Sequence, residues 1–150
     1  MKLAEALLER ADLQKRLALL ESRLCRNARV QEGEAPAEDP NALLGELEQL
    51  TCRLEELIRR INLTNAAVTD RGESITALLA RRDMLSKKAG IMQTFLSEAS
   101  ATASRATRTE IAIRSTVPVA ELRKDADKLS AELRTLDNRI QALNWAVELQ

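Results

Sequence analysis

The C-terminal segment LSAELRTLDNRIQALNWAVEL constrains the fold more than any other part of the chain. Its large aliphatic residues recur at steps of four and three, namely Leu129, Leu133, Leu136, Ile140, Leu143 and Val147. That spacing keeps an apolar stripe on one side of an α-helix and is the seam pattern of a coiled coil. Because a helix cannot bury such a stripe alone, the segment needs a partner helix.

Three earlier segments carry the same period and complete a set of four expected helices. Asp39 followed by Pro40 marks the start of the second, because Asp accepts hydrogen bonds from first-turn N–H groups and Pro needs no partner there. The periodicity predicts helices at about residues 2–29, 40–62, 76–100 and 118–148.

Two seam positions hold arginine instead of an aliphatic residue. Arg10 interrupts the first seam and Arg82 interrupts the third. Such an arginine either pairs with an acid of another helix or lies at a splayed, solvent-filled end of the bundle. Of these two alternatives we favour the solvent-filled end.

The first two expected helices have similar lengths and are joined by a short acidic connection, which favours an antiparallel hairpin. In that register Cys25 lies opposite residues 41–46, whereas Cys52 lies one or two turns further along. The separation exceeds the span of a disulfide, so we expect free thiols, most simply as small core residues.

A small β element is expected between the helical hairpins. Gly72 suits the tip of a hairpin with strands at 66–69 and 73–75, and alternating β-branched residues predict a further strand at 110–117. A lone strand is unstable, so the three are expected to form one small sheet. The predicted fold is mainly α, with long antiparallel helical hairpins, coiled-coil-like seams and a small β element, in one domain over residues 1–150.

The composition excludes several classes of enzyme. The chain has no His, which removes imidazole acid–base catalysis, His-activated nucleophiles and imidazole zinc sites. It contains no phosphate-binding loop and no nucleophile elbow. The acidic connection at residues 32–39 lacks the alternation and the sixth-position Gly of a calcium loop. We therefore expect no enzyme activity, no cofactor and no catalytic or metal-binding residues.

The charge balance and the N-terminus indicate a cytoplasmic protein. Lys plus Arg equals Asp plus Glu at 23 each, so no net field attracts nucleic acid or anionic lipid. Acids interrupt the N-terminal apolar pattern, which leaves no signal-peptide core, and no apolar run reaches a membrane-spanning length. Two lone cysteines fit a reducing compartment.

Basic residues gather near the third expected helix, namely Arg81, Arg82, Lys87, Lys88, Arg105, Arg108 and Arg114. Nucleic-acid readers usually add aromatic residues or glycine loops, and these are missing. We interpret the basic residues as a solvated face, balanced by Asp83 and the acids of residues 32–39, and expect no nucleic-acid partner.

Some large apolar residues lie beside the main seams instead of within them, namely Leu44, Ile58, Met84, Ile91 and Phe95. A single elongated helix pair with apolar residues on more than one face cannot bury them all. These side chains are therefore candidates for a contact between subunits, and we expect the protein to bind itself as a homo-oligomer.

Several segments resemble the bacterial septicolysin-like proteins: MKLAEALLERADLQKRL, NARVQEGEAPAEDPNALL, IRRINLTN, LLARRD, STVPVAEL and LDNRIQALNW. The resemblance covers most of the chain, and the family name implies a membrane-damaging cytolysin. Polar or singular residues in or near these segments are the candidate interaction residues: Asn62, Asn65, Arg82, Asp83, Arg114, Asn138, Arg139, Asn144 and Trp145. Alternatively, their side chains hydrogen-bond the irregular chain between helices.

Three functional hypotheses follow. The first is a non-enzymatic oligomeric scaffold or interaction protein that holds partners on its helix surfaces. The second is the membrane-active, secreted cytolysin that the resemblance implies. The third is a nucleic-acid-associated factor whose helical arms lie along RNA.

Overall fold

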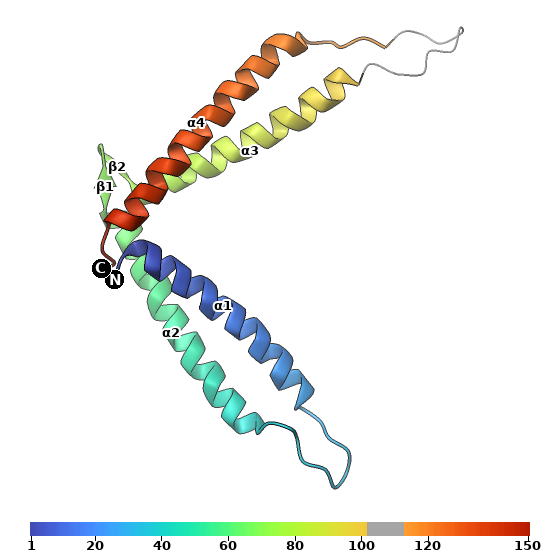
Figure 1. Cartoon of the computed structure of the whole chain (residues 1–150), viewed down its shortest axis with the longest axis vertical. Helices are drawn as coiled ribbons and strands as arrows, with labels where there is room; N and C mark the ends of the chain where they lie inside the picture. The colour runs from blue at the N-terminus through green and yellow to red at the C-terminus, as the bar shows by residue number, and fades with distance from the viewer. Residues whose placement is uncertain (102–112) are drawn as a thin grey trace, which may run out of the picture. The chain divides into compact units, whose positions relative to one another are not determined.

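The structure is a computed structural model in which residues 1–101 and 113–150 are described. Its elements, in chain order, are α1 (Leu3–Arg26), α2 (Pro40–Ala67), β1 (Thr69–Asp70), β2 (Glu73–Ser74), α3 (Ile75–Ser100) and α4 (Val119–Ala146) (Figure 1). The mainly α fold class with four helices and a small β element is confirmed. The chain divides into two compact units, one formed by Met1–Ile75 with Ala142–Gln150 and the other by Thr76–Gln141.

In the first unit, α1 and α2 form the expected hairpin. The core consists of seam residues that are at most 5% exposed: Leu3, Ala6, Leu13 and Leu20 from α1, with Leu43, Leu50, Leu57 and Ile61 from α2. Two ion pairs join the helices at different heights, Glu9 to Arg53 at 2.7 Å and Arg23 to Glu46 at 3.0 Å. Glu9 precedes Arg23 along α1, whereas its partner Arg53 follows Glu46 along α2. The two helices therefore run antiparallel.

The connection between α1 and α2 is held by side chains at both of its ends. Asn27 donates through Nδ2 to the carbonyl oxygen of Arg23 at 2.9 Å and accepts the N–H of Glu38 at 3.0 Å. Arg23 also forms an ion pair with Glu38 at 2.6 Å, and this hydrogen bond lowers the pKa of the Glu38 carboxyl. The acids of this connection were expected to balance the basic face of α3, but Glu38 is bound by Arg23 instead.

The two seam arginines have different surroundings in the structure. Arg10 is half-buried, and its Nε is shielded from solvent with no hydrogen-bond partner among the described residues. Only this nitrogen of Arg10 is shielded, and no ion pair of Arg10 with another helix is seen in the described residues, so the solvent-filled end stays a prediction for Arg10. Arg82 is also half-buried and pairs with Asp83 on its own helix at 2.7 Å, so the acid is its neighbour in sequence.

The β element is smaller than predicted. Helix α2 continues to Ala67, and only Thr69 with Ser74 and Asp70 with Glu73 are paired. Residues 113–117 form no strand, and residues 110–112 lie outside the described residues. The predicted three-stranded sheet is thus wrong for the part that is described, because strands of two residues offer too short an edge for an eight-residue partner.

The tip of this hairpin has a strained residue. Arg71 and Gly72 have φ values of 51° and 83°, so the expected left-handed glycine is confirmed and the turn has two central residues with positive φ. Such a turn matches the twist of a β-hairpin and favours Asn-Gly. Arg71 adopts this conformation at a steric cost, because its Cβ approaches the following carbonyl oxygen.

Replacing Arg71 with asparagine is expected to stabilise the protein by about 1 kcal/mol, because asparagine tolerates the left-handed region better. Thermal unfolding followed by circular dichroism measures this as a higher Tm. Arg71→Ala is the control, because alanine tolerates the left-handed region no better than arginine does, and its Tm is expected not to rise. A Tm for Arg71→Asn at or below that of the wild type would contradict the prediction.

The two ends of the chain lie next to each other in the first unit (Figure 1). Lys2 and Glu148 form an isolated antiparallel bridge, in which Leu3 donates to Val147 and Leu149 donates to Met1, both at 2.9 Å. Helix α4 ends at Ala146, whereas the sequence predicted a helix as far as residue 148. Residues 147–150 are not helical. We call residues 147–150 the C-terminal clasp.

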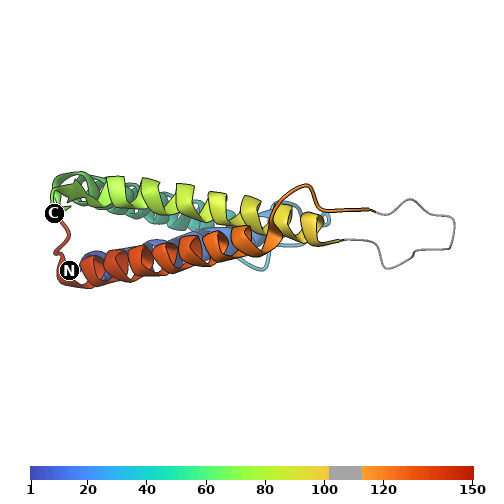
Figure 2. The ribbon, with the colours of Figure 1, turned by 90° about the horizontal axis from the view of Figure 1, so that it is seen from above.

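The second unit is a hairpin of α3 and α4, which run side by side in Figures 1 and 2. Arg81 on α3 pairs with Glu132 on α4 at 2.8 Å, and Arg123 on α4 donates to Ser100 on α3 at 3.1 Å. Four of its seam residues are buried, namely Leu78, Leu96, Leu136 and Ile140, against eight in the hairpin of α1 and α2. This hairpin covers its seam less completely than the hairpin of α1 and α2.

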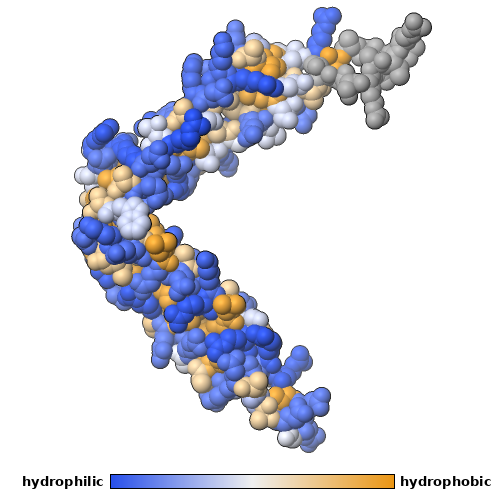
Figure 3. All heavy atoms as spheres, viewed as in Figure 1, coloured by the Kyte–Doolittle hydropathy of each residue, from blue (hydrophilic) through white to orange (hydrophobic). Residues whose placement is uncertain are grey.

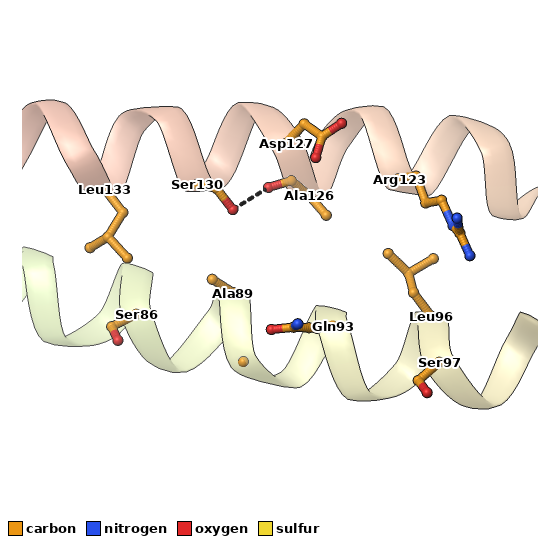
Figure 4. Close-up of a pocket in the computed structure, with 11 residues that line it drawn as sticks. Ser86, Ala89, Gln93, Leu96, Ser97, Arg123, Ala126, Asp127, Ser130 and Leu133 are labelled. Carbon is orange, nitrogen blue, oxygen red and sulfur yellow. Dashed lines mark hydrogen bonds between the residues drawn. The ribbon is translucent and has the colours of Figure 1, made fainter.

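A groove of about 880 Å³ accompanies the incomplete seam. Figure 4 shows Leu96 and Leu133 pointing into the space between the two helices, while smaller side chains such as Ala89 and Ser130 leave it unfilled. Arg123 and Asp127 are the titratable residues of its lining. No hydrogen bond joins Asp127 to a serine of this lining among the described residues, so no activated nucleophile is formed there in this structure.

Candidate interaction surface

Helix α3 exposes a second line of apolar residues besides its seam. Met84, Ile91 and Phe95 are 62%, 61% and 44% exposed. Steps of seven and four residues place them on one face of the helix. We call these three residues the α3 stripe. Single exposed apolar residues are ordinary, but an aligned set on one face is typical of an interaction site.

Ile91 and Phe95 of the α3 stripe line a shallow hollow. The hollow has a volume of about 500 Å³ and is lined by Lys87, Gly90, Ile91, Thr94 and Phe95. Gly90 opens it, since no atom lies within 4 Å of the place where a Cβ would stand. The hydroxyl of Thr94 donates to the carbonyl oxygen of Gly90 at 3.1 Å. A partner can therefore cover this hydroxyl without leaving its donor unpaired.

A comparable face lies on α2 in the first unit. Leu44 and Ile58 are 53% and 37% exposed, Thr51 between them is also exposed, and Leu47 is half-buried. We call Leu44, Leu47, Thr51 and Ile58 the α2 stripe. A hollow of about 570 Å³ opens beside Thr51 and Ile58. The Thr51 hydroxyl donates to backbone carbonyls of its own helix at 2.9 and 3.0 Å, so it too can be covered.

The five apolar residues singled out beside the main seams are thus all exposed. Their exposure could be predicted from their spacing relative to the seam, because a residue off the seam points away from the partner helix. Charged and polar side chains separate the apolar atoms over both hairpins in Figure 3. On the face that Figure 3 shows, the apolar atoms therefore form several small areas between polar ones.

The nine polar and singular candidates are divided between the two units. The first unit contains Asn62, Asn65, Asn144 and Trp145, whereas the second contains Arg82, Asp83, Arg114, Asn138 and Arg139. Asn144 is buried, and Trp145 beside it is exposed. Arg82 and Asp83 neutralise each other on α3. Their role in binding stays a prediction.

Neither cysteine is the core residue that we expected. Cys25 and Cys52 are both free and exposed. Cys52 donates to Glu48 at 3.4 Å, and this contact raises the pKa of the thiol. The carboxylate therefore reduces the thiolate population and the nucleophilicity of Cys52.

The described residues offer neither a metal cluster nor a membrane-spanning helix. No group of three His, Cys, Asp or Glu residues in residues 1–101 and 113–150 could hold a metal ion. No helix within those ranges has the length and apolar character needed to span a bilayer. The aligned apolar stripes thus stand out as the candidate interaction surface of the described chain.

The fold and these stripes define a protein of long helical hairpins with exposed apolar helix faces. The chain belongs to the family of unknown function DUF6847, whose profile matches residues 10–149. It is 42% identical to a functionally unknown conserved protein from Corynebacterium diphtheriae, with 100% of this chain and 99% of that chain covered and a TM-score of 0.93. No curated protein matches the chain.

Proposed function

We propose that this protein is a non-enzymatic, homo-oligomeric helical scaffold that uses its exposed helix faces to bind a second copy. The observation that carries the proposal is the alignment of Met84, Ile91 and Phe95 on one exposed face of α3. Covering three such side chains removes apolar surface from water, which is the main driving force of association. The threonine next to this face is already hydrogen-bonded, so a dry contact leaves no unpaired hydroxyl there.

The lining of the groove between α3 and α4 is compatible with the same proposal. That groove carries one arginine and one aspartate among its titratable lining residues, and the two thiols are separate and exposed. A helical hairpin with a rigid spacing between its faces is suited to holding partners at fixed positions.

The test is the mass of the purified protein by light scattering as its concentration is raised. We expect an oligomer for the wild type and a shift to monomer for Ile91→Lys, with self-affinity weakened by at least about thirtyfold, as for a central apolar contact. Leu19→Lys is the matched control, because Leu19 is 66% exposed and Ile91 is 61% exposed, but Leu19 lies on α1. A wild-type protein that stays monomeric at high concentration would contradict the proposal.

Two measurements separate this function from the other hypotheses. Pure protein is expected to release no dye from liposomes, whereas the cytolysin that the resemblance implies would release it. RNA and DNA are expected to keep their mobility at low salt, where electrostatic binding is strongest. Dye release or a mobility shift would replace the scaffold proposal with the corresponding alternative.

A further inference from the structure

We propose that the α3 stripe of one copy packs antiparallel against the α2 stripe of a second copy. This pairing rests on the proposed homo-oligomeric function and names the two surfaces that meet. The partner is a second copy of this chain, since each copy carries one stripe of each kind.

The spacing of the two stripes matches in opposite chain directions. From Met84, the α3 stripe advances by seven residues to Ile91 and by four more to Phe95. From Ile58, the α2 stripe goes back by seven residues to Thr51 and by four more to Leu47. When Met84 lies opposite Ile58 in an antiparallel pair, the other positions are therefore level with each other.

The sizes of the residues that meet in this register are complementary. Ile91 lies opposite Thr51, which is small enough to leave a hollow of about 570 Å³ on α2. Phe95 lies opposite Leu47, next to Leu44 on the following turn, so an aromatic ring meets two aliphatic side chains. A large residue that enters a gap on the facing helix is the packing of antiparallel helix pairs.

The charges beside the stripes are complementary as well. Lys88 follows Met84 by four residues, and Glu55 precedes Ile58 by three, so the antiparallel register brings both to the same flank with an offset of about 1.5 Å along the axis. Both residues are exposed, and neither forms an ion pair with another residue of the described chain. A parallel arrangement of Met84 and Ile58 would place them at opposite ends of the contact.

Charge reversal tests the pairing by sedimentation equilibrium on the full chain. Lys88→Glu and Glu55→Lys are each expected to weaken self-association by roughly tenfold, because an attractive pair becomes a repulsive one. An equimolar mixture of the two variants should assemble like the wild type, since each chain then presents the charge that the other needs. Lys124→Glu and Glu21→Lys carry the same charge changes on exposed positions of α4 and α1 and should have no effect.

Each outcome has a defined meaning. Circular dichroism of every variant shows whether its helices are retained, and this is expected for exposed positions. If the wild type is oligomeric but the charge reversals or their mixture behave like the controls, the pairing of α3 with α2 is overturned while the scaffold function stands. The double variant Lys88→Glu/Glu55→Lys carries both reversed charges in one chain. If this variant assembles normally but the mixture of the two single variants does not, Lys88 and Glu55 contact each other within one chain. That result would contradict the second copy as the partner. A monomeric wild type overturns the scaffold function itself.

Discussion

Replacing Leu57 with alanine lowers the free energy of unfolding by about 3 kcal/mol. Leu57 is a seam residue of α2 with 0% of its surface exposed. Its truncation removes three buried carbon atoms and leaves a cavity between α1 and α2, and rigid helix pairs collapse around such cavities only in part. Urea unfolding followed by circular dichroism measures the loss as a lower midpoint at an unchanged slope.

Leu63→Ala on the same helix is the matched control, because Leu63 is 52% exposed and its truncation creates no cavity. We expect a change within about 0.5 kcal/mol for this control. Equal losses for the two variants would contradict the burial of the α2 seam. A large loss for Leu57→Ala alone would support it.

Removal of the C-terminal clasp is the second large effect, and we expect a loss of about 3 kcal/mol. Leu149 is buried and contributes about 2 kcal/mol through its side chain. The truncation also removes the hydrogen bond from the N–H of Gln150 to Thr64 Oγ1 at 3.0 Å and that from Arg60 Nε to the Gln150 carbonyl oxygen at 2.8 Å. Each such bond contributes about 1 kcal/mol to the free energy of unfolding. The truncation also removes the entropy cost of ordering these residues, which offsets part of the loss.

The readout is thermal unfolding together with hydrogen exchange at the N-terminus of α1. The amide of Leu3 donates to Val147 at 2.9 Å, so it should exchange faster in the truncated chain. Glu148→Gln removes only the exposed ion pairs of the clasp with Lys2 and the N-terminal ammonium, so it should lower the Tm much less than the truncation does. A truncated chain with the wild-type Tm and a protected Leu3 amide would show that the clasp does not stabilise the first unit.

Much of the candidate surface could be predicted from local spacing. Positions three or four residues apart share a helix face whatever the rest of the chain does, so the sequence alone separates Met84 and Ile91 from the seam. The spacing does not reveal hollows, and the role of Gly90 in opening one on α3 depends on the space around it in the folded chain. Polarity alone does not say which residues from different helices come together, so the polar candidates stay a prediction.

The wrong predictions concern contacts between residues far apart in sequence. The alternation at 110–117 favoured a strand, but a strand also needs a partner edge, and β1 and β2 are each two residues long. The clasp was missed because the heptad pattern runs through Val147, while a bridge to Lys2 ends the helix at Ala146. Cys25 and Cys52 were assigned to the core by their residue type, but their positions on the helices expose them.

Residue spacing alone was enough to predict the four helices, their seams and the faces that stay exposed, because an α-helix converts spacing along the chain directly into direction in space. How well each seam is covered, where the chain ends bind and which charges pair became known only from the packed helices. Those features depend on distances between segments that are remote in the chain, as the pairs Arg23 with Glu38 and Lys2 with Glu148 show. Local periodicity carries no information about such distances, since they are set only when whole helices pack.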